Sequence, residues 1–263
     1  MTSDPPAVST TIDDARYGAR VATVAFAPWR INVFGRELIE ALTGEFVRLA
    51  EDDDLRIAIL TGGIGQAFSM GADVNEMAAI ADADEAVAFI TSLHNLCQSI
   101  RDLPVPVIAR IEGHCLGGGL EVAASCDLRI ASEGSMFGMP EVRLGLPSVI
   151  EAALLPSLIG WGKTRELLYT GDTIDSGEAQ RIGLVERVVP VNRLDDELAG
   201  WVQSIAIESD ATAIRLQKQL LLRWEVLPIG EAIEAGIDSF RVAFHDDTPQ
   251  KLMQEWIDRP RGD

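Results

Sequence analysis

A run of three glycines, Gly117 to Gly119, lies between an apolar segment and a helical pattern, and no other feature constrains the fold of this chain as strongly. The apolar segment, Val105 to Ile111, predicts a strand, and Gly118 to Cys126 predicts the helix. Successive glycines leave backbone N–H groups unshielded, and at a helix start those groups have no partner within the helix. Such a turn suits an anion or a developing oxyanion. Close packing of a helix on a strand requires the same residues, so the turn alone leaves both interpretations open.

Strand, turn and helix recur in that order upstream of the glycines. Val21 to Phe26 predicts a strand that ends in a turn at Pro28, and Asn32 is a suitable N-cap for a following helix. Ile57 to Thr61 is an apolar run with the length of one buried strand, and glycines end it. Two sets of apolar residues recur at helical spacing: Phe34, Leu38, Leu42, Phe46 and Leu49, and then Ala86, Ile90, Leu93, Cys97 and Ile100. The repetition predicts an α/β fold.

From about Leu194 onward the pattern changes to long helical segments without a strand. We therefore expect a core at residues 1–193 and a helical region at residues 194–263. With 263 residues the chain is long enough to bury a large apolar interior. Four apolar residues of the helical region need a packing partner, either on the core or on another subunit: Trp224, Phe240, Phe244 and Trp256.

Composition restricts the partners of this chain. The 22 basic and 41 acidic residues give a formal net charge of −19, and the resulting field repels nucleic acid and anionic membranes. The first residues carry acids and prolines in place of a secretory signal, and no apolar stretch approaches the ~20 residues that span a bilayer. Three cysteines, at 97, 115 and 126, suit neither a disulfide framework nor a zinc site. We expect a cytoplasmic protein without a metal. Because of the negative charge, any anionic ligand must be held by local groups such as helix N-termini, backbone amides or a few arginines.

One acidic residue, Glu121, lies about one turn into the helix that follows the glycines. Its neighbours Leu120 and Val122 are apolar. The helix dipole at this position favours the ionised carboxylate, which is the form that a general base needs. An acid that only stabilises the helix dipole is the structural alternative.

A second acidic residue, Glu141, lies in the apolar, glycine-containing segment from Phe137 to Gly145. Burial there raises the pKa of a carboxyl group toward the range used in proton transfer. An ion pair of Glu141 with Arg143 or Arg129 is the structural alternative. Two acids in different surroundings form the arrangement that separates a general base from a general acid.

Four segments together resemble the enoyl-CoA hydratase/isomerase family, also called the crotonase superfamily. They follow one another in the family's order and cover most of residues 20–190: IAILTGGIGQAFSMGADVNEM (57–77), PVPVIARIEGHCLGGGLEVAASCDLRIAS (104–132), FGMPEVRLGLP (137–147) and ELLYTGDTIDSGEAQRIGLVERVVP (166–190). A lone glycine turn is nonspecific, whereas four ordered segments are specific. The resemblance implies a crotonase-like spiral of repeated β-β-α units, followed by a helical region that forms trimers, which pair into hexamers.

The resemblance also implies roles for individual residues. In this family two backbone N–H groups hold the thioester carbonyl, and by motif they fall on Ala72 and Gly118. Hydratases of the family use two glutamates, so Glu121 would orient and deprotonate water and Glu141 would deliver a proton to C2. The backbone at further positions, together with Gly118, would line the site of the acyl-CoA substrate: Met70, Ala72, Asp73, Val74 and Asn75. Neither a metal nor a redox cofactor is implied, because coenzyme A is part of the substrate.

Two departures from the family pattern concern the substrate. Asn75 stands where many hydratases carry a basic residue, which leaves Arg30 as a candidate contact for the CoA phosphates only through its place in an early loop. The segment Leu146 to Glu151 replaces a glycine-rich turn of the family, and this change reshapes the wall near the acyl group.

Glu151 allows two interpretations. With Ser148 it has the spacing of a capping box that begins a helix, and it is also in the right region for a third acid of the site. The histidines have no nucleophile at a recognisable spacing, and Cys115 suits a small buried side chain, so structural or surface roles are expected for all of them: His94, His114 and His245.

These features predict an enoyl-CoA hydratase, which adds water across the double bond of a 2-enoyl-CoA thioester. Within the family, the alternatives are an isomerase or an enzyme that hydrolyses or cleaves a C–C bond of an unusual acyl-CoA. Outside catalysis, the alternative is a CoA-ester-binding or RNA-binding member. The net charge of −19 opposes RNA binding, and the retention of both glutamates opposes a non-catalytic member. A serine peptidase on the related fold lacks a Ser/His/Asp arrangement.

Overall fold

The computed structural model describes residues 8–14, 18–26, 32–65 and 67–259. Its contacts divide the chain into two compact units, which we call the core unit (residues 1–208) and the tail unit (residues 209–263). The predicted turn at Pro28 and the candidate residue Arg30 lie outside the described residues.

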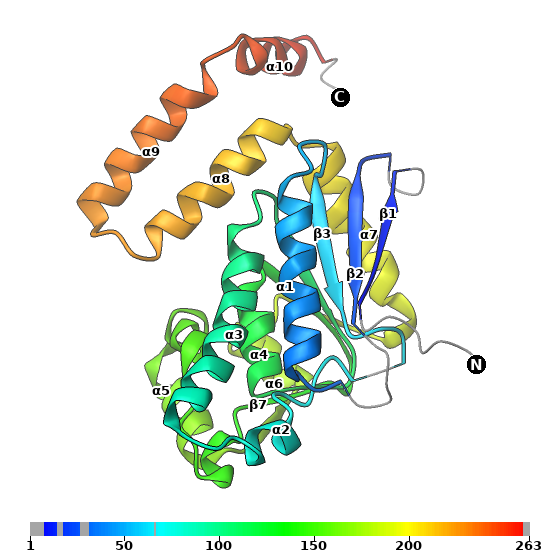
Figure 1. The fold of residues 1–263 in the computed structure, drawn as a ribbon. Coiled ribbons are helices and arrows are strands. Elements are labelled where there is room, and N and C mark those ends of the chain that lie inside the picture. Colours follow the sequence, from blue (N-terminus) through cyan, green and yellow to red (C-terminus); the bar gives the residue numbers. More distant parts are fainter. Residues whose placement is uncertain (1–7, 15–17, 27–31, 66, 260–263) are drawn as a thin grey trace. The chain divides into compact units, whose positions relative to one another are not determined.

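A six-stranded sheet forms the centre of the core unit (Figure 1), with the strand order β1-β2-β3-β4-β6-β9. All neighbours pair in parallel except β1 and β2, which are antiparallel. The strands are β1 (Ser9–Asp13), β2 (Val21–Ala25), β3 (Ile57–Thr61), β4 (Val107–Ile111), β6 (Leu128–Ser132) and β9 (Arg187–Val189). Every residue of β3 and β4 is buried, as expected for short apolar strands that are covered on both faces of a parallel sheet.

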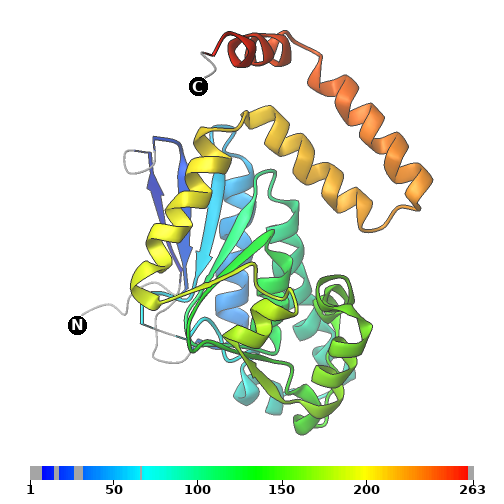
Figure 2. The same cartoon turned by 180° about the vertical axis from the view of Figure 1, so that it is seen from behind.

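Alternation along the strands divides the apolar residues between two faces. Ala58 and Leu60 belong to the larger cluster, which includes the buried faces of α1 (Arg36–Ala50) and α3 (Ala83–Asp102). Ile57 and Ile59 pack on the other side against α7, whose residues in this smaller cluster are Leu194, Leu198 and Val202. Figure 1 shows α1 and α3 on one face, and Figure 2 shows α7 (Leu194–Val202) on the opposite face.

The packing of α7 on the sheet also explains where the two units divide. The contacts place the division after Glu208, and not between residues 193 and 194 where the change of sequence pattern suggested it. Helical periodicity shows that α7 is a helix, but it does not show that this helix covers the sheet.

A β-β-α unit recurs in the core, and the second strand of each unit is short. In the clearest case β4 is followed by β5 (His114–Leu116) and α4 (Gly118–Ser125). In the next, β6 is followed by β7 (Met136–Gly138), two short 3₁₀ turns and α5 (Leu155–Thr170). The short strands make a second sheet in the order β5-β7-β8, and a bridge between Ser69 and Cys115 extends this sheet to the segment after β3. The loops of successive units therefore meet at one place.

The remaining elements of the core unit are short. They are α2 (Val74–Ala78), the 3₁₀ turns η1 (Glu141–Leu144), η2 (Ile150–Leu154) and η3 (Val191–Arg193), β8 (Thr173–Asp175), α6 (Ser176–Arg181) and the π-helical turn η4 (Gln203–Ile207).

The tail unit contains three helices and no strand in its described residues, 209–259. The helices are α8 (Ala211–Trp224), α9 (Ile229–Ala243) and α10 (Thr248–Asp258). Helices α8 and α9 contact each other, and the Trp224 indole N–H donates to the Ala232 carbonyl at 3.0 Å. Near the end of α9, the rings of Phe240 and Phe244 contact each other at a tilt of 44°, with centroids 4.9 Å apart.

The predicted cap of the first helix is wrong. Helix α1 begins at Arg36 with Gly35 as its N-cap, and Asn32 lies upstream, buried. The Asn32 side-chain amide donates to the carbonyls of Gly62 (2.8 Å) and Ala67 (2.7 Å), so it fixes the loop after β3. The side-chain amide of asparagine can cap a helix or donate to carbonyl groups of a loop. Which of the two it does depends on the folded loop and not on the local sequence.

Candidate active site

The loop after β3 and the glycine turn after β5 lie side by side in the core unit. The Leu116 N–H donates to the Ser69 carbonyl at 3.0 Å, and the Ser69 N–H donates to the His114 carbonyl at 2.9 Å. These hydrogen bonds hold the two segments next to each other. A methyl group added at Gly118 would lie 3.6 Å from the Ala72 nitrogen. The backbone nitrogens of Ala72 and Gly118 are therefore close neighbours, although they are far apart in the sequence.

The N–H groups of Ala72 and Gly118 are free to bind a ligand. Within the described part of the chain, neither donates a hydrogen bond to a backbone acceptor. Gly118 is the first residue of α4, where an α-helix leaves N–H groups without partners. Both residues line the same cavity. Two neighbouring backbone donors without a backbone partner among the described residues therefore lie at one cavity wall.

Two glycines make this arrangement possible. Gly71 and Gly117 have φ angles of +100° and +52°, which L side chains rarely adopt. A methyl group at Gly117 would also lie 2.6 Å from Oε1 of Glu141, and one at Gly71 would lie 3.0 Å from the Leu116 carbonyl oxygen. Backbone and carboxylate approach each other here because no side chain intervenes.

Glu121 lies in the first turn of α4 and is 4% exposed. Its Oε1 accepts a hydrogen bond from the Ala152 N–H at 3.2 Å. Burial, followed by the charge of Glu141, raises the pKa of Glu121 to about 8. Burial therefore acts against the helix dipole, which was expected to favour the ionised carboxylate at this position.

Glu141 begins the turn η1 and lines the same cavity as Glu121. Its Oε2 accepts a hydrogen bond from the Ser148 hydroxyl at 2.8 Å. Burial raises the pKa of Glu141, while its own backbone N–H and the Ser148 hydroxyl oppose the rise. The expectation of a raised pKa is confirmed.

The arginines considered as structural partners of Glu141 bind elsewhere. Arg143 pairs with Asp172, and Arg129 pairs with Glu186. Glu141 therefore remains available to a ligand in the cavity.

The cavity has a volume of about 470 Å³ and is mostly apolar. Its polar groups gather at one place, where the glycine turn meets Glu121 and Glu141, and its walls carry large apolar side chains, among them Met77, Ile80, Phe89, Ile90, Leu93 and Leu146. A pocket of this size with a few convergent polar groups is typical of a small-molecule site. Of the residues expected to line the substrate site, Met70, Ala72, Val74 and Gly118 do line this cavity.

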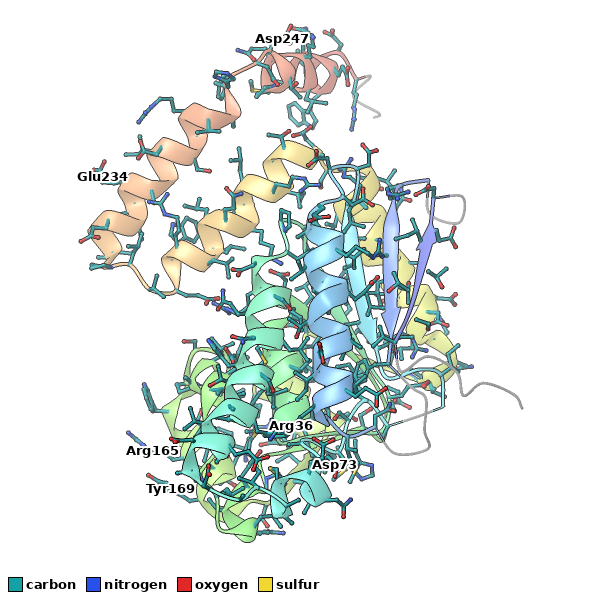
Figure 3. All side chains as sticks on the ribbon, viewed as in Figure 1. Arg36, Asp73, Arg165, Tyr169, Glu234 and Asp247 are labelled. Atoms are coloured by element: carbon teal, nitrogen blue, oxygen red, sulfur yellow. The ribbon has the colours of Figure 1, made fainter. Side chains whose placement is uncertain are left out.

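Asp73 and Asn75 do not belong to the cavity lining. Asp73 is the N-cap of α2, and its carboxylate accepts from the Asn75 N–H at 2.8 Å. Asp73 is labelled in Figure 3, and its N–H donates to the carbonyl of Phe34, two residues before α1, at 3.0 Å. The match to the family motif identified the segment, whereas the direction of each side chain depends on the cap.

Comparisons with known proteins show the family to which this chain belongs. The model of a family described as enoyl-CoA hydratase/isomerase matches residues 17–261. The chain belongs to this family. Among its relatives, a probable enoyl-CoA hydratase of Mycobacterium bovis is 33% identical over 233 residues, which cover 88% of this chain and 89% of the relative. The short-chain-enoyl-CoA hydratase of Clostridium acetobutylicum is 31% identical over 242 residues, which cover 91% of this chain and 92% of the relative.

Solved structures of the enoyl-CoA hydratase/isomerase family share the fold. The enoyl-CoA hydratase of Mycobacterium smegmatis superimposes with a TM-score of 0.91 at 26% identity, over 98% of this chain and 99% of that one. The enoyl-CoA hydratase of Bacillus anthracis gives a TM-score of 0.87 at 28% identity, over 95% and 96% of the two chains. The predicted crotonase-like α/β fold with a C-terminal helical region is confirmed, and the chain is an enzyme of this family.

The spacing of Ser148 and Glu151 suggested a capping box, and this interpretation is wrong. The turn η2 is capped by Val149 without a side-chain hydrogen bond. Ser148 instead donates to Glu141, and Glu151 Oε1 lies 2.8 Å from Nδ1 of His94 on α3. Sequence reasoning missed Ser148 and His94 as neighbours of the site. Only their positions in the sequence could have indicated this. Ser148 lies in the segment that departs from the family pattern, and His94 follows Leu93, which is on the apolar face of α3.

Other predictions about this family member concern cysteines, metals and membranes. Cys97, Cys115 and Cys126 are buried and form no disulfide with one another, and for Cys115 a small buried side chain was expected. In the part of the chain that the structure describes, no group of His, Cys, Asp or Glu side chains is arranged to hold a metal ion. None of the helices in the described ranges combines the length and the apolar character of a membrane span.

Proposed function

We propose that this chain is an enoyl-CoA hydratase, which adds water across the 2,3 double bond of a 2-enoyl-CoA thioester. The observation that carries the proposal is the meeting of two free backbone donors and two carboxyl groups at one end of an apolar cavity: Ala72, Gly118, Glu121 and Glu141. The relatives named as hydratases at 31% and 33% identity support the same activity.

In the proposed reaction, the N–H groups of Ala72 and Gly118 donate to the thioester oxygen. Glu121, in its ionised form, takes a proton from water while the water oxygen bonds to C3 of the acyl chain. The electrons of the double bond move toward the thioester oxygen, where the two donors stabilise the enolate. The enolate then takes a proton at C2 from Glu141. The cycle closes when Glu121 has lost and Glu141 has regained one proton, so that the sum of the steps is the addition of one water.

The surroundings of both acids raise their pKa, so each carboxyl group exchanges a proton at a higher pH than an exposed glutamate does. A carboxyl group with a pKa of about 8, as at Glu121, exchanges its proton close to neutral pH. The raised pKa of Glu141 makes its protonated form, the form proposed to deliver a proton to C2, more populated than in an exposed glutamate. The apolar walls exclude water from the donors, which strengthens their interaction with the developing charge.

A panel of acyl-CoA esters tests the proposal directly. The purified protein is offered crotonyl-CoA, a 3-enoyl-CoA, and branched or ring-bearing 2-enoyl-CoA esters, and each product is identified by mass spectrometry. We expect a mass gain of one water on at least one 2-enoyl ester. Conversion of the 3-enoyl ester without any hydration would make the chain an isomerase, and cleavage of a C–C bond would make it a hydrolase or lyase. Binding of the esters without turnover would make it a non-catalytic member.

The proposed oxyanion hole is tested by Gly118→Pro. Proline lacks the backbone N–H and is well tolerated at the first position of a helix, so α4 should persist. The matched control is Gly118→Ala, which adds the same Cβ contact to Leu93 but keeps the N–H. We expect the proline variant to have a kcat roughly 10²–10³ times lower than the alanine variant. Equal rates for the two variants would remove Gly118 from the oxyanion hole.

We also propose that the tail unit contributes to a homotrimer or homohexamer. Exposed apolar side chains on its helices support this assembly: Trp224, Phe240, Phe244 and Trp256. Light scattering of the full chain measures the molar mass, and a monomer at micromolar concentration would contradict the proposal.

A further inference from the structure

The turn η2 is the structural neighbour of Glu121 on the side away from the glycines. Its Ala152 N–H donates to Glu121 Oε1, and Glu151, the preceding residue, is 7% exposed. The charge of Glu151 also acts on Glu121 and raises its pKa, after the larger effects of burial and Glu141. One short turn thus presents both a hydrogen-bond donor and a second carboxyl group to the proposed base.

A buried carboxylate is costly unless it is paired, and Glu151 interacts with two side chains of α3, His94 and Cys97. Oε1 lies 2.8 Å from Nδ1 of His94, and Oε2 is buried without a hydrogen-bond partner. The His94 side chain is 45% exposed, so the imidazole joins the interior of the site to solvent. Because His94 belongs to α3 and Glu151 to η2, their hydrogen bond also fastens the turn to the helix.

We propose that the His94–Glu151 pair is a positioning element for Glu121. The pair fixes the turn η2, so that the Ala152 N–H holds the Glu121 carboxylate. The pair also sets the pH range in which Glu121 acts. This inference rests on the proposed function in assigning Glu121 as the base. Neither His94 nor Glu151 touches the substrate cavity, so both act through Glu121.

The electrostatic part of the proposal involves titratable groups on three elements. Glu141 on η1, Glu151 on η2 and Cys97 on α3 interact with Glu121, and His94 acts on it through Glu151. Burial and then the charge of Glu151 raise the pKa of Cys97 well above its ordinary value, so this thiol stays neutral. Since two buried carboxylates repel, removing the charge of Glu151 lowers the pKa of Glu121.

Two pairs of variants test the two parts. Glu151→Gln keeps an acceptor for His94 but removes the charge, and its matched control is Glu166→Gln, which removes an exposed acid on α5. His94→Ala removes the partner of Glu151, whereas His94→Asn retains an amide donor at the place of Nδ1. With the best 2-enoyl-CoA substrate, we expect the acidic limb of kcat/KM to move to lower pH in Glu151→Gln and to stay in place in Glu166→Gln. We expect His94→Ala to lower kcat at least tenfold with little change in KM, and His94→Asn to recover most of it.

A second readout does not depend on turnover. Carbon-13 NMR of the glutamate carboxyls in the ligand-free full chain follows the titration of Glu121, whose signal is identified by its loss in Glu121→Gln. A lower pKa of Glu121 in Glu151→Gln supports the inference even if every ester in the panel proves inert, in which case only the proposed function fails. An unchanged Glu121 titration in Glu151→Gln, or wild-type kcat in His94→Ala, overturns the inference and leaves the proposed function in place.

Discussion

The surroundings of Glu121 and Glu141 differ although both carboxyl groups line one cavity. Glu121 lies on a helix inside the core, accepts a backbone hydrogen bond and faces two other carboxyls, Glu141 and Glu151. Glu141 lies at a short 3₁₀ turn, and a hydroxyl group from Ser148 donates to it. The surroundings of Glu121 oppose its ionisation strongly. Those of Glu141 also oppose ionisation, but the hydrogen bond from Ser148 offsets part of that effect.

This difference shows how one fold separates two chemically identical side chains. A helix in the interior holds Glu121 where desolvation and repulsion act together, and its pKa rises to about 8. A turn at the cavity wall allows Ser148 to reach Glu141 and to favour the carboxylate. The two acids are therefore expected to respond differently to substitution, in activity, in stability and in pH dependence.

The largest expected effect is the loss of turnover when either acid is replaced. Glu121→Gln and Glu141→Gln each keep the shape of the side chain but cannot exchange a proton, so kcat should fall by about 10²–10⁴ in each. Because the two acids serve one reaction, the double variant should lose little more than the single ones. Calorimetric titration with a CoA ester should show that binding survives. Full activity of Glu141→Gln would overturn its assignment as the proton donor to C2.

The next effect concerns stability, and it should separate the two acids. The folded-state pKa of Glu121 is raised from 4.5 to about 8, so the folded chain holds a proton that the unfolded chain releases between these values. The stability contributed by this group is therefore greatest below pH 4.5 and falls as the pH rises toward 8. Glu121→Gln should raise the free energy of unfolding at alkaline pH by on the order of a few kcal/mol, with little change in acid.

Urea unfolding near both ends of that pH range measures this effect. The gain should be smaller in Glu141→Gln, because Ser148 already stabilises the ionised form, and absent in the surface control Glu166→Gln. An equal gain for the two active-site variants would contradict the difference in their surroundings.

The smallest expected effect is a change in the pH profile of Ser148→Ala. Loss of the hydroxyl removes a donor that favours the ionised Glu141, so the pKa of Glu141 rises and the limb of kcat/KM that Glu141 controls moves to higher pH. Ser92→Ala is the matched control, because the Ser92 hydroxyl donates only to the Phe89 carbonyl within α3. A shift toward lower pH in Ser148→Ala would mean that Ser148 does not stabilise the carboxylate.

The sequence predicts features of this molecule that depend on local order. The buried strands β3 and β4, the long helix α3 and the turn at Gly117 all follow from runs of apolar residues and glycines. Such patterns are read from neighbouring positions, so no knowledge of distant contacts is needed. The motif match then located both glutamates and both backbone donors.

Features that depend on the choice between distant partners were not predictable in this way. The side chains of Asn32 and Ser148 are of types that can cap a helix or make a tertiary hydrogen bond. In the folded chain both make tertiary hydrogen bonds. The pairing of His94 with Glu151 joins residues 57 positions apart, and no spacing rule covers it. The pKa of Glu121 follows from complete burial, which a position near a helix start does not reveal.

The bridge between Ser69 and Cys115 has a consequence for variation in this enzyme. It brings Ala72 and Gly118 together through main-chain hydrogen bonds, so the proposed oxyanion hole contains no functional side chain that a substitution can remove. Substitutions at the wall from Leu146 to Val149 change the shape offered to the acyl group without touching that bridge. If the proposed reaction holds, selectivity for the acyl chain and stabilisation of the enolate can be inherited, and engineered, as separate traits.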